Sequence, residues 1–315
     1  MFWDRINSAL FTRLHGGSRS HYSPTRHVVQ LIHLALFVAL FAAFVPAQPA
    51  AAAPRNVERV IAFSERNSNA TRSATVKCPS GKKVISTAAN INGEVGVIAL
   101  TGIAPNGTLT NVKVTAAEVG AGTRSTWSVT AIAICADPLP GLQRVSVTSI
   151  SNSDSQKLVN AICPTGQKVL GVGASIKGLN GGQGALHTFH PISAERGVLV
   201  GGAETGAGTT QSWSMRADAI CVDASAVPDL QRVEVGNLSG SDTLQSATAF
   251  CPSGKQVIGA GGSLHDAPSS RIALFGINPD PALTRVNTTG VEIAGGTTGN
   301  WTVHAYAMCA SVERL

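Results

Sequence analysis

The chain has 315 residues, of which 43% are apolar, 13% are charged and 33 are glycine. A near-average apolar share excludes a disordered chain. Few charges with abundant Gly, Ser, Thr and Val favour short strands and tight turns over amphipathic helices.

The N-terminal segment differs from the rest of the chain. Four arginines precede an apolar run at 34–45, and proline and small residues follow it. This layout predicts a secretory signal peptide over residues 1–53, cleaved between 47 and 53. Because the run is shorter than the ~20 residues that span a bilayer, a retained anchor is the less favoured alternative, and no membrane span is expected after cleavage.

Export changes how the charge is interpreted. The first 53 residues hold four Arg and one Asp, which leaves 20 basic and 17 acidic residues and a net charge of +3 instead of +6. So small a charge over some 260 residues argues against a nucleic-acid partner.

The remaining chain repeats itself three times. The first repeated motif is C-P-[ST]-G-[KQ]-[KQ]-V-[IL], and the second is W-[ST]-[VM]-x-A-x-A-[IM]-C. The first motif begins at Cys78, Cys163 and Cys251, and the second ends at Cys135, Cys221 and Cys309. A period this regular predicts three units, residues 54–137, 138–225 and 226–315.

Each unit reads as a series of short strands in the same order. An opening strand such as 145–148 is followed by a polar turn, a strand into the first cysteine, and a Pro-[Ser/Thr]-Gly turn into the next strand. A strand A-L-x-x-[IF]-x-P, a further short strand, a glycine-rich turn and the Trp-led strand complete the unit. About six strands per unit predict an all-β fold, built as β-sandwich modules or as a β-prism-like arrangement with pseudo-threefold symmetry.

The Trp-led strand indicates which residues form the core. By period-two alternation Trp127, Trp213 and Trp301 share one small, apolar face with the cysteine eight residues later. We expect these tryptophans to pack against disulfides, although an exposed Trp would suit sugar stacking. The opposite face carries Ile132, Asp218 or Tyr306, and its variability predicts contact with water.

All six cysteines lie after the predicted signal, where disulfides persist. Zinc is disfavoured because no C-x-x-C occurs. Repeat symmetry leaves two disulfide schemes. The preferred scheme pairs the two cysteines of each repeat, and the other joins Cys135 to Cys163, Cys221 to Cys251 and Cys309 to Cys78 in a closed ring.

One acidic position recurs in all three repeats. Glu118, Glu204 and Glu292 each lie 17 residues before the second cysteine, directly ahead of the glycine-rich turn. A ligand-binding role would have the carboxylate hold a sugar hydroxyl or a cation. The alternative is structural: the carboxylate accepts from the turn's N–H groups, or it pairs with an arginine near the start of each repeat (Arg59, Arg144 and Arg232).

Other chemistry is weakly supported. A glycosidase needs two carboxylates about 5–10 Å apart, and no second acid recurs. His187 and His190 form H-x-x-H in one repeat only, so no metal or other cofactor is expected. The G-x-G motifs at 171–173 and 259–261 lack a following helix and predict turn or bulge glycines.

The repeated motifs resemble repeats in secreted bacterial, particularly actinobacterial, proteins. The sequence C-P-[ST]-G-[KQ]-x-V-[IL]-G-x-G is complete in repeats two and three, whereas repeat one has 86–88 Ser-Thr-Ala in its place. A remoter likeness, in the C-P-x-G turn, is to threefold β-prism proteins of the vitelline membrane outer layer type. These resemblances imply export and a β fold, and they supply no activity.

We therefore expect a secreted, non-catalytic binding or structural surface protein. Its partner would be a glycan, a cell-envelope polymer or a surface protein, and three copies of a weak site would bind by avidity. A secreted hydrolase that uses a repeated Glu is the alternative.

Overall fold

The computed structural model of the chain describes residues 53–313, so the predicted signal peptide lies outside the described residues except for Ala53. The described part is all-β, and each repeat contributes six strands, which confirms the predicted fold class. The first repeat holds β1 (Glu58–Phe63), β2 (Thr71–Lys77), β3 (Lys83–Asn92), β4 (Ile98–Pro105), β5 (Asn111–Glu118) and β6 (Ser128–Ala136).

The other two repeats follow the same order. The second holds β7 (Gln143–Thr148), β8 (Gln156–Ile162), β9 (Gln167–Lys177), β10 (Gly184–Pro191), η1 (Ser193–Glu195), β11 (Gly197–Glu204), β12 (Ser214–Asp223) and η2 (Ala224–Ala226). The third holds β13 (Gln231–Gly236), β14 (Leu244–Phe250), β15 (Gln256–His265), β16 (Ile272–Pro279), β17 (Arg285–Glu292) and β18 (Thr302–Ala310). None of the helical segments between residues 53 and 313 has the length and apolarity to cross a membrane.

Each repeat is a sandwich of two three-stranded layers. In the first repeat the layer β1-β6-β3 packs on the layer β2-β5-β4, and the other repeats match it. The three tryptophans are fully buried between the layers, as predicted. A disulfide joins the two layers of every repeat, which confirms the preferred scheme. The pairs are Cys78–Cys135, Cys163–Cys221 and Cys251–Cys309.

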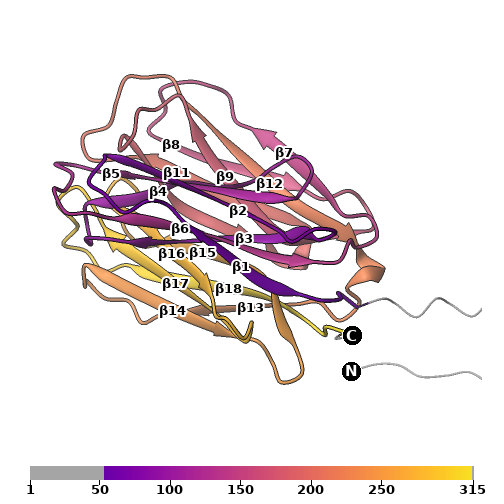
Figure 1. The fold of residues 1–315 in the computed structure, drawn as a ribbon. Helices are drawn as coiled ribbons and strands as arrows, with labels where there is room; N and C mark the ends of the chain where they lie inside the picture. Colours follow the sequence, from indigo (N-terminus) through magenta and orange to yellow (C-terminus); the bar gives the residue numbers. More distant parts are fainter. Residues whose placement is uncertain (1–52, 314–315) are drawn as a thin grey trace, which may run out of the picture. The chain divides into compact units, whose positions relative to one another are not determined.

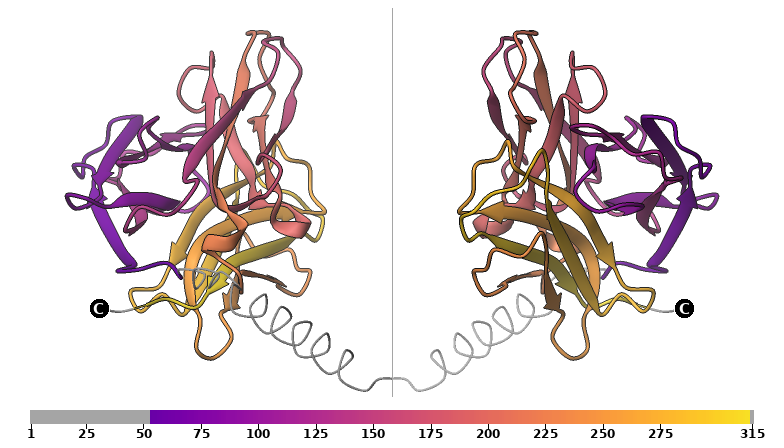
Figure 2. Two further views of the ribbon diagram at one scale, coloured as in Figure 1. Left: turned by 90° about the vertical axis from the view of Figure 1, so that its right-hand side faces the viewer. Right: turned by 90° about the vertical axis from the view of Figure 1, so that its left-hand side faces the viewer.

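Each layer continues into a neighbouring repeat. Strand β3 pairs with β16, β9 with β4, and β15 with β10, and each of these junctions, here called seams, joins two residue pairs. The result is three six-stranded antiparallel sheets, each built from two repeats (Figure 1). Figure 2 shows the three repeats, coloured from indigo to yellow, around a common centre. The repeats thus form a closed ring with pseudo-threefold order.

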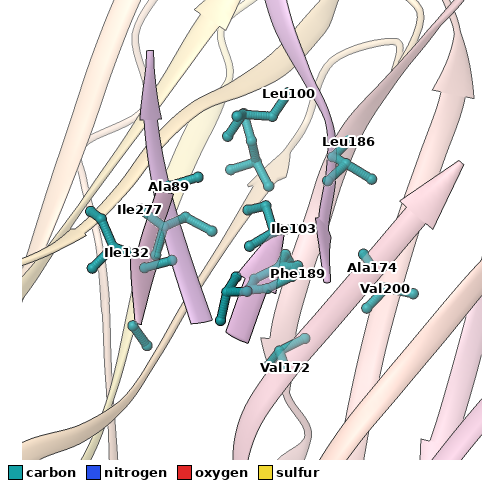
Figure 3. Close-up of a cluster of buried hydrophobic side chains, with 14 of the residues drawn as sticks. Ala89, Leu100, Ile103, Ile132, Val172, Ala174, Leu186, Phe189, Val200 and Ile277 are labelled. Atoms are coloured by element: carbon teal, nitrogen blue, oxygen red, sulfur yellow. The ribbon is translucent and has the colours of Figure 1, made fainter. Parts of the chain in front are cut away.

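The centre of the ring is apolar. Strands β3, β9 and β15 contact one another there. Ile103, Phe189 and Ile277 occupy the same position in the three repeats and are fully buried. Figure 3 shows buried side chains of all three repeats gathered in this core. All three repeats therefore contribute to one continuous core.

The G-x-G glycines allow backbones to approach closely at this centre. A Cβ at Gly171 would lie 2.5 Å from the carbonyl oxygen of Ile85, and one at Gly259 would overlap the carbonyl oxygen of Leu170. The register shifts beside Gly259 in β15, as predicted for a bulge glycine. In repeat one the matching Ser86 uses its hydroxyl instead, since its Oγ accepts from the N–H of Ala260 at 3.1 Å.

The prediction that the second face of the Trp-led strand meets water is wrong. Ile132 and Asp218 are 0% exposed and Tyr306 is 2% exposed. Each of these strands lies between two others, and side chains from neighbouring strands cover its polar residues. Ser146 donates to Asp218, for example, and Arg144 lies 3.8 Å from the same carboxylate.

The two ends of the described chain meet. The N–H of Glu313 donates to the carbonyl of Pro54 at 2.9 Å, and its carboxylate accepts from Arg55 at 2.6 Å. These contacts join the end of repeat three to the start of repeat one.

Candidate functional site

The three repeated glutamates end β5, β11 and β17, and each one binds the tryptophan of its own repeat. The indole N–H donates to carboxylate Oε1, nine residues earlier in the chain. The distances are 3.0 Å for Trp127–Glu118, 3.0 Å for Trp213–Glu204 and 3.2 Å for Trp301–Glu292. Glu204 and Glu292 are buried, whereas Glu118 is half-buried.

The second carboxylate oxygen reaches the glycine-rich turn. Oε2 of Glu118 accepts from the N–H of Thr123 at 3.2 Å, and Oε2 of Glu204 accepts from the N–H of Thr209 at 2.9 Å. These glutamates therefore link the turn to the buried indole. This is the geometry expected of a structural support, and a direct ligand-binding role for them stays a prediction.

The repeated arginines bind elsewhere. Arg144 donates to the carbonyl of Pro105 at 3.0 Å, and Arg232 donates to the carbonyl of Pro191 at 3.1 Å. Arg59 donates to the Asn278 side chain at 3.0 Å. Each bond crosses from one repeat to its neighbour, so these arginines tie the seams rather than the glycine-rich turns.

We expect Glu204→Ala to lower the free energy of unfolding by about 2–3 kcal/mol, because it leaves a buried indole N–H and a turn N–H without their acceptor. Chemical denaturation followed by circular dichroism measures this loss. The half-buried Glu118→Ala is the matched variant, and it should cost less because water replaces part of its hydrogen bonding. Equal costs for the two variants would contradict this account.

The three glycine-rich turns meet at one end of the ring. A Cβ on Gly120 would lie 3.9 Å from Cα of Ala294, and one on Gly206 would lie 3.6 Å from Cβ of the same alanine. The turns border a pocket of about 520 Å³ with few polar groups, here called the axial pocket. Arg271 also lines it and donates to the carbonyl of Ala294. The sequence predicts the three turns but gives no signal for their convergence or for Arg271.

A second, more polar cleft lies beside Glu204. It has a volume of about 490 Å³ and is lined by the turn after β11 and by the loop between β15 and β16 of the next repeat. The N–H of Gly206 in the turn donates to the carbonyl of Ser270 in the loop at 3.3 Å. Its polar lining consists of Ser155, Gln156, Glu204, Thr209, Thr210, Ser269 and Ser270. Apart from Glu204, sequence reasoning missed these residues, because they come together only across two repeats.

The equivalent loop of repeat two packs tightly on repeat one. A Cβ at Gly182 would overlap the carbonyl oxygen of Glu118. The loop of repeat three carries Ser270 at the position of Gly182, and its residues Pro268, Ser269 and Ser270 line the cleft beside Glu204. The three glutamates thus share their bonding to Trp but differ in their surroundings.

The H-x-x-H histidines do not converge on a common ligand. His187 Nδ1 lies 2.9 Å from the Thr188 hydroxyl, while the His190 ring stacks on Tyr306 with centroids 4.5 Å apart. Among residues 53–313 no three His, Cys, Asp or Glu side chains are placed to hold a metal ion.

Comparison of the chain with models of known protein families and with curated proteins gave no match.

Proposed function

We propose that this is a secreted, non-catalytic binding protein whose ligand is a hydroxyl-rich polymer, either a glycan or a cell-envelope polymer. The observation that carries the proposal is the cleft of about 490 Å³ beside the glycine-rich turn of repeat two, lined by serine, threonine and glutamine side chains. Such groups donate and accept hydrogen bonds, as sugar hydroxyls do. The three disulfides fit an extracellular protein.

In this proposal Glu204 shapes the cleft and performs no chemistry. Its two oxygens already accept from Trp213 and Thr209, so they hold the turn against the core. The ligand would contact the hydroxyl and amide side chains and the exposed backbone of the turn. Glycoside hydrolysis would need a second carboxylate about 5–10 Å away, and Glu204 is the one acid among the residues that line the cleft.

A structural surface protein is the second candidate. It is favoured by the bonds that tie Glu118, Glu204 and Glu292 to buried indole groups, because a carboxylate engaged in this way has less capacity for a ligand. Under this proposal the triplicated motifs serve folding alone.

A pair of bulky variants tests the binding proposal. Ala207, an exposed residue of the turn after β11, lines both the polar cleft and the axial pocket, whereas the equivalent exposed Ala121 lines the axial pocket but not the polar cleft. A panel of glycans and purified cell-wall polymers is screened against the wild type, Ala207→Trp and Ala121→Trp. We expect Ala207→Trp to weaken binding at least about tenfold, or 1.4 kcal/mol, and Ala121→Trp to leave it unchanged.

Each other result has a definite meaning. Equal loss of binding in both variants would indicate that the ligand binds in the axial pocket instead of the polar cleft. Binding unaffected by either variant would contradict a site at the turns. The absence of binding by the wild type would favour the structural candidate.

A further inference from the structure

Every histidine of residues 53–313 lies on one sheet. His187 and His190 are on β10, His265 is on β15 and His304 is on β18, three adjacent strands of the sheet β13-β18-β15-β10-β11-β8. The matching positions of the other two sheets carry other residue types. They are Thr101, Ala104, Lys177 and Arg216 in one sheet, and Phe275, Asn278, Asn92 and Thr130 in the other. One third of a threefold arrangement thus carries all the imidazoles of the described residues, and imidazole is the side chain whose ordinary pKa lies closest to neutral pH.

Three of these imidazoles form a connected cluster with Tyr306 and Glu234. The His190 ring lies almost parallel to the Tyr306 ring, at 11°, and His265 packs on His304 with centroids 4.6 Å apart. The Tyr306 hydroxyl donates to Glu234 at 3.1 Å, and His304 Nδ1 lies 2.9 Å from the same carboxylate oxygen. These side-chain contacts link four strands, β10, β15, β18 and β13.

The cluster lies across the seam between repeats two and three. There β10 and β15 join only through Thr188↔Ser263 and Phe189↔Gly262. His190 belongs to repeat two, while Tyr306 belongs to repeat three. Arg232 reaches the same place, with its guanidinium 4.9 Å from the Tyr306 ring centre. Side-chain packing by the cluster therefore reinforces a short backbone junction.

The surroundings of the imidazoles favour their neutral form. Burial lowers the pKa of His187 to about 4. Burial also holds the pKa of His190 below its ordinary value, and the charge of Arg232 acts in the same direction. The pKa of His265 is lowered by burial and by His304, against the opposite effects of Asp266 and Glu234.

The pKa of the carboxyl group of Glu234 is also lowered. Burial alone would raise the pKa of Glu234, but hydrogen bonds from His304 and Tyr306 and the charge of Arg232 hold it below the ordinary value. Glu234 therefore stays ionised in mild acid. The pH dependence of opening at this seam is therefore attributed to His187, His190 and His265.

A histidine with a lowered pKa binds fewer protons in the closed state than in an open one, so opening takes up protons and becomes easier as the pH falls. The window runs from the ordinary value of 6.5 down to about 4, the pKa of buried His187. We propose that the β10–β15 seam is an acid-sensitive junction, at which protonation of His187, His190 and His265 on its two strands separates repeat two from repeat three while the two other seams stay closed.

Hydrogen exchange of the intact protein tests this proposal, because the three seams serve as controls for one another. Exchange is followed by mass spectrometry at pH 7 and pH 5 and is corrected for the intrinsic effect of pH. We expect protection of peptides covering β10 and β15 at 188–189 and 262–263 to fall at least about tenfold at pH 5. Peptides covering the β4–β9 seam (102–103 and 174–175) and the β3–β16 seam (276–277 and 89–90) should keep their protection.

A variant built from the protein's own repeats supplies the second test. His187→Phe, His190→Asn, His265→Asn and His304→Thr together install residues that repeats one and three carry at the matching positions. This variant should lose the difference between the seams. If the fourfold variant does not fold, the single variant His190→Asn is used instead. It should reduce the difference in protection between the seams. Equal loss of protection at all seams, no loss at any of them, or an unchanged response in the variants would overturn the proposal.

Discussion

Gly259→Ala is expected to destabilise the protein by about 3–4 kcal/mol, far more than one added methyl group usually costs. The new Cβ would overlap the carbonyl oxygen of Leu170 in the neighbouring repeat, and it would also lie 2.8 Å from the Met308 side chain. Neither partner is at a flexible surface, since both Leu170 and Met308 are fully buried. Relief would require β9 and β15 to separate at the centre of the ring. Thermal and urea denaturation measure the loss.

Gly299→Ala is the control for this prediction. Its Cβ would find only the Thr297 hydroxyl, at an ordinary 3.6 Å, and the residue lies in an exposed turn. Its cost should stay within about 0.5 kcal/mol. Similar costs at the two positions would mean that the centre of the ring yields easily to an added methyl group.

Removing the disulfide of repeat two with Cys163→Ala and Cys221→Ala is expected to cost about 4 kcal/mol. The bond closes a loop with a sequence separation of 58 residues, and the chain-entropy model assigns that much to a loop of this length. The bond also joins the two layers of a sandwich that has few large side chains. Urea denaturation of the variant under oxidising conditions gives the difference.

Reduction of the wild type provides the comparison for this variant. With all three bonds open, the wild type should be less stable than the variant, which keeps the bonds of repeats one and three. If the variant unfolded at the same urea concentration as the oxidised wild type, the packing between the layers would be holding repeat two together without the disulfide.

Features that depend on neighbouring residues in the chain were predictable from the sequence. The two cysteine motifs mark the repeats, the Trp-led alternation identifies the buried tryptophans, and repeat symmetry reduces the disulfide pairings to two schemes, of which the preferred one is observed. These patterns are local, or they are repeated three times.

Contacts between strands that are distant in the chain were not predictable in the same way. Alternation assigns Asp218 and Tyr306 to a water-facing side, but partners from other strands bury them. The polar cleft combines Gln156 with Ser269, more than 100 residues apart, and neither position stands out in its own repeat. The repeated glutamates were recognised, yet their indole partners are evident only once β5 and β6 face each other.

The meeting of Pro54 with Glu313 has a consequence for how such a molecule can diversify. A ring of three equivalent units can in principle be assembled from three separate identical chains, as in cyclic oligomers. In that form any substitution appears three times, once in every subunit. Linking the units in one polypeptide removes this restriction, because each copy then has its own codons. All the histidines of the described residues can therefore lie on one side, while the matching positions of the other two sides carry different residue types.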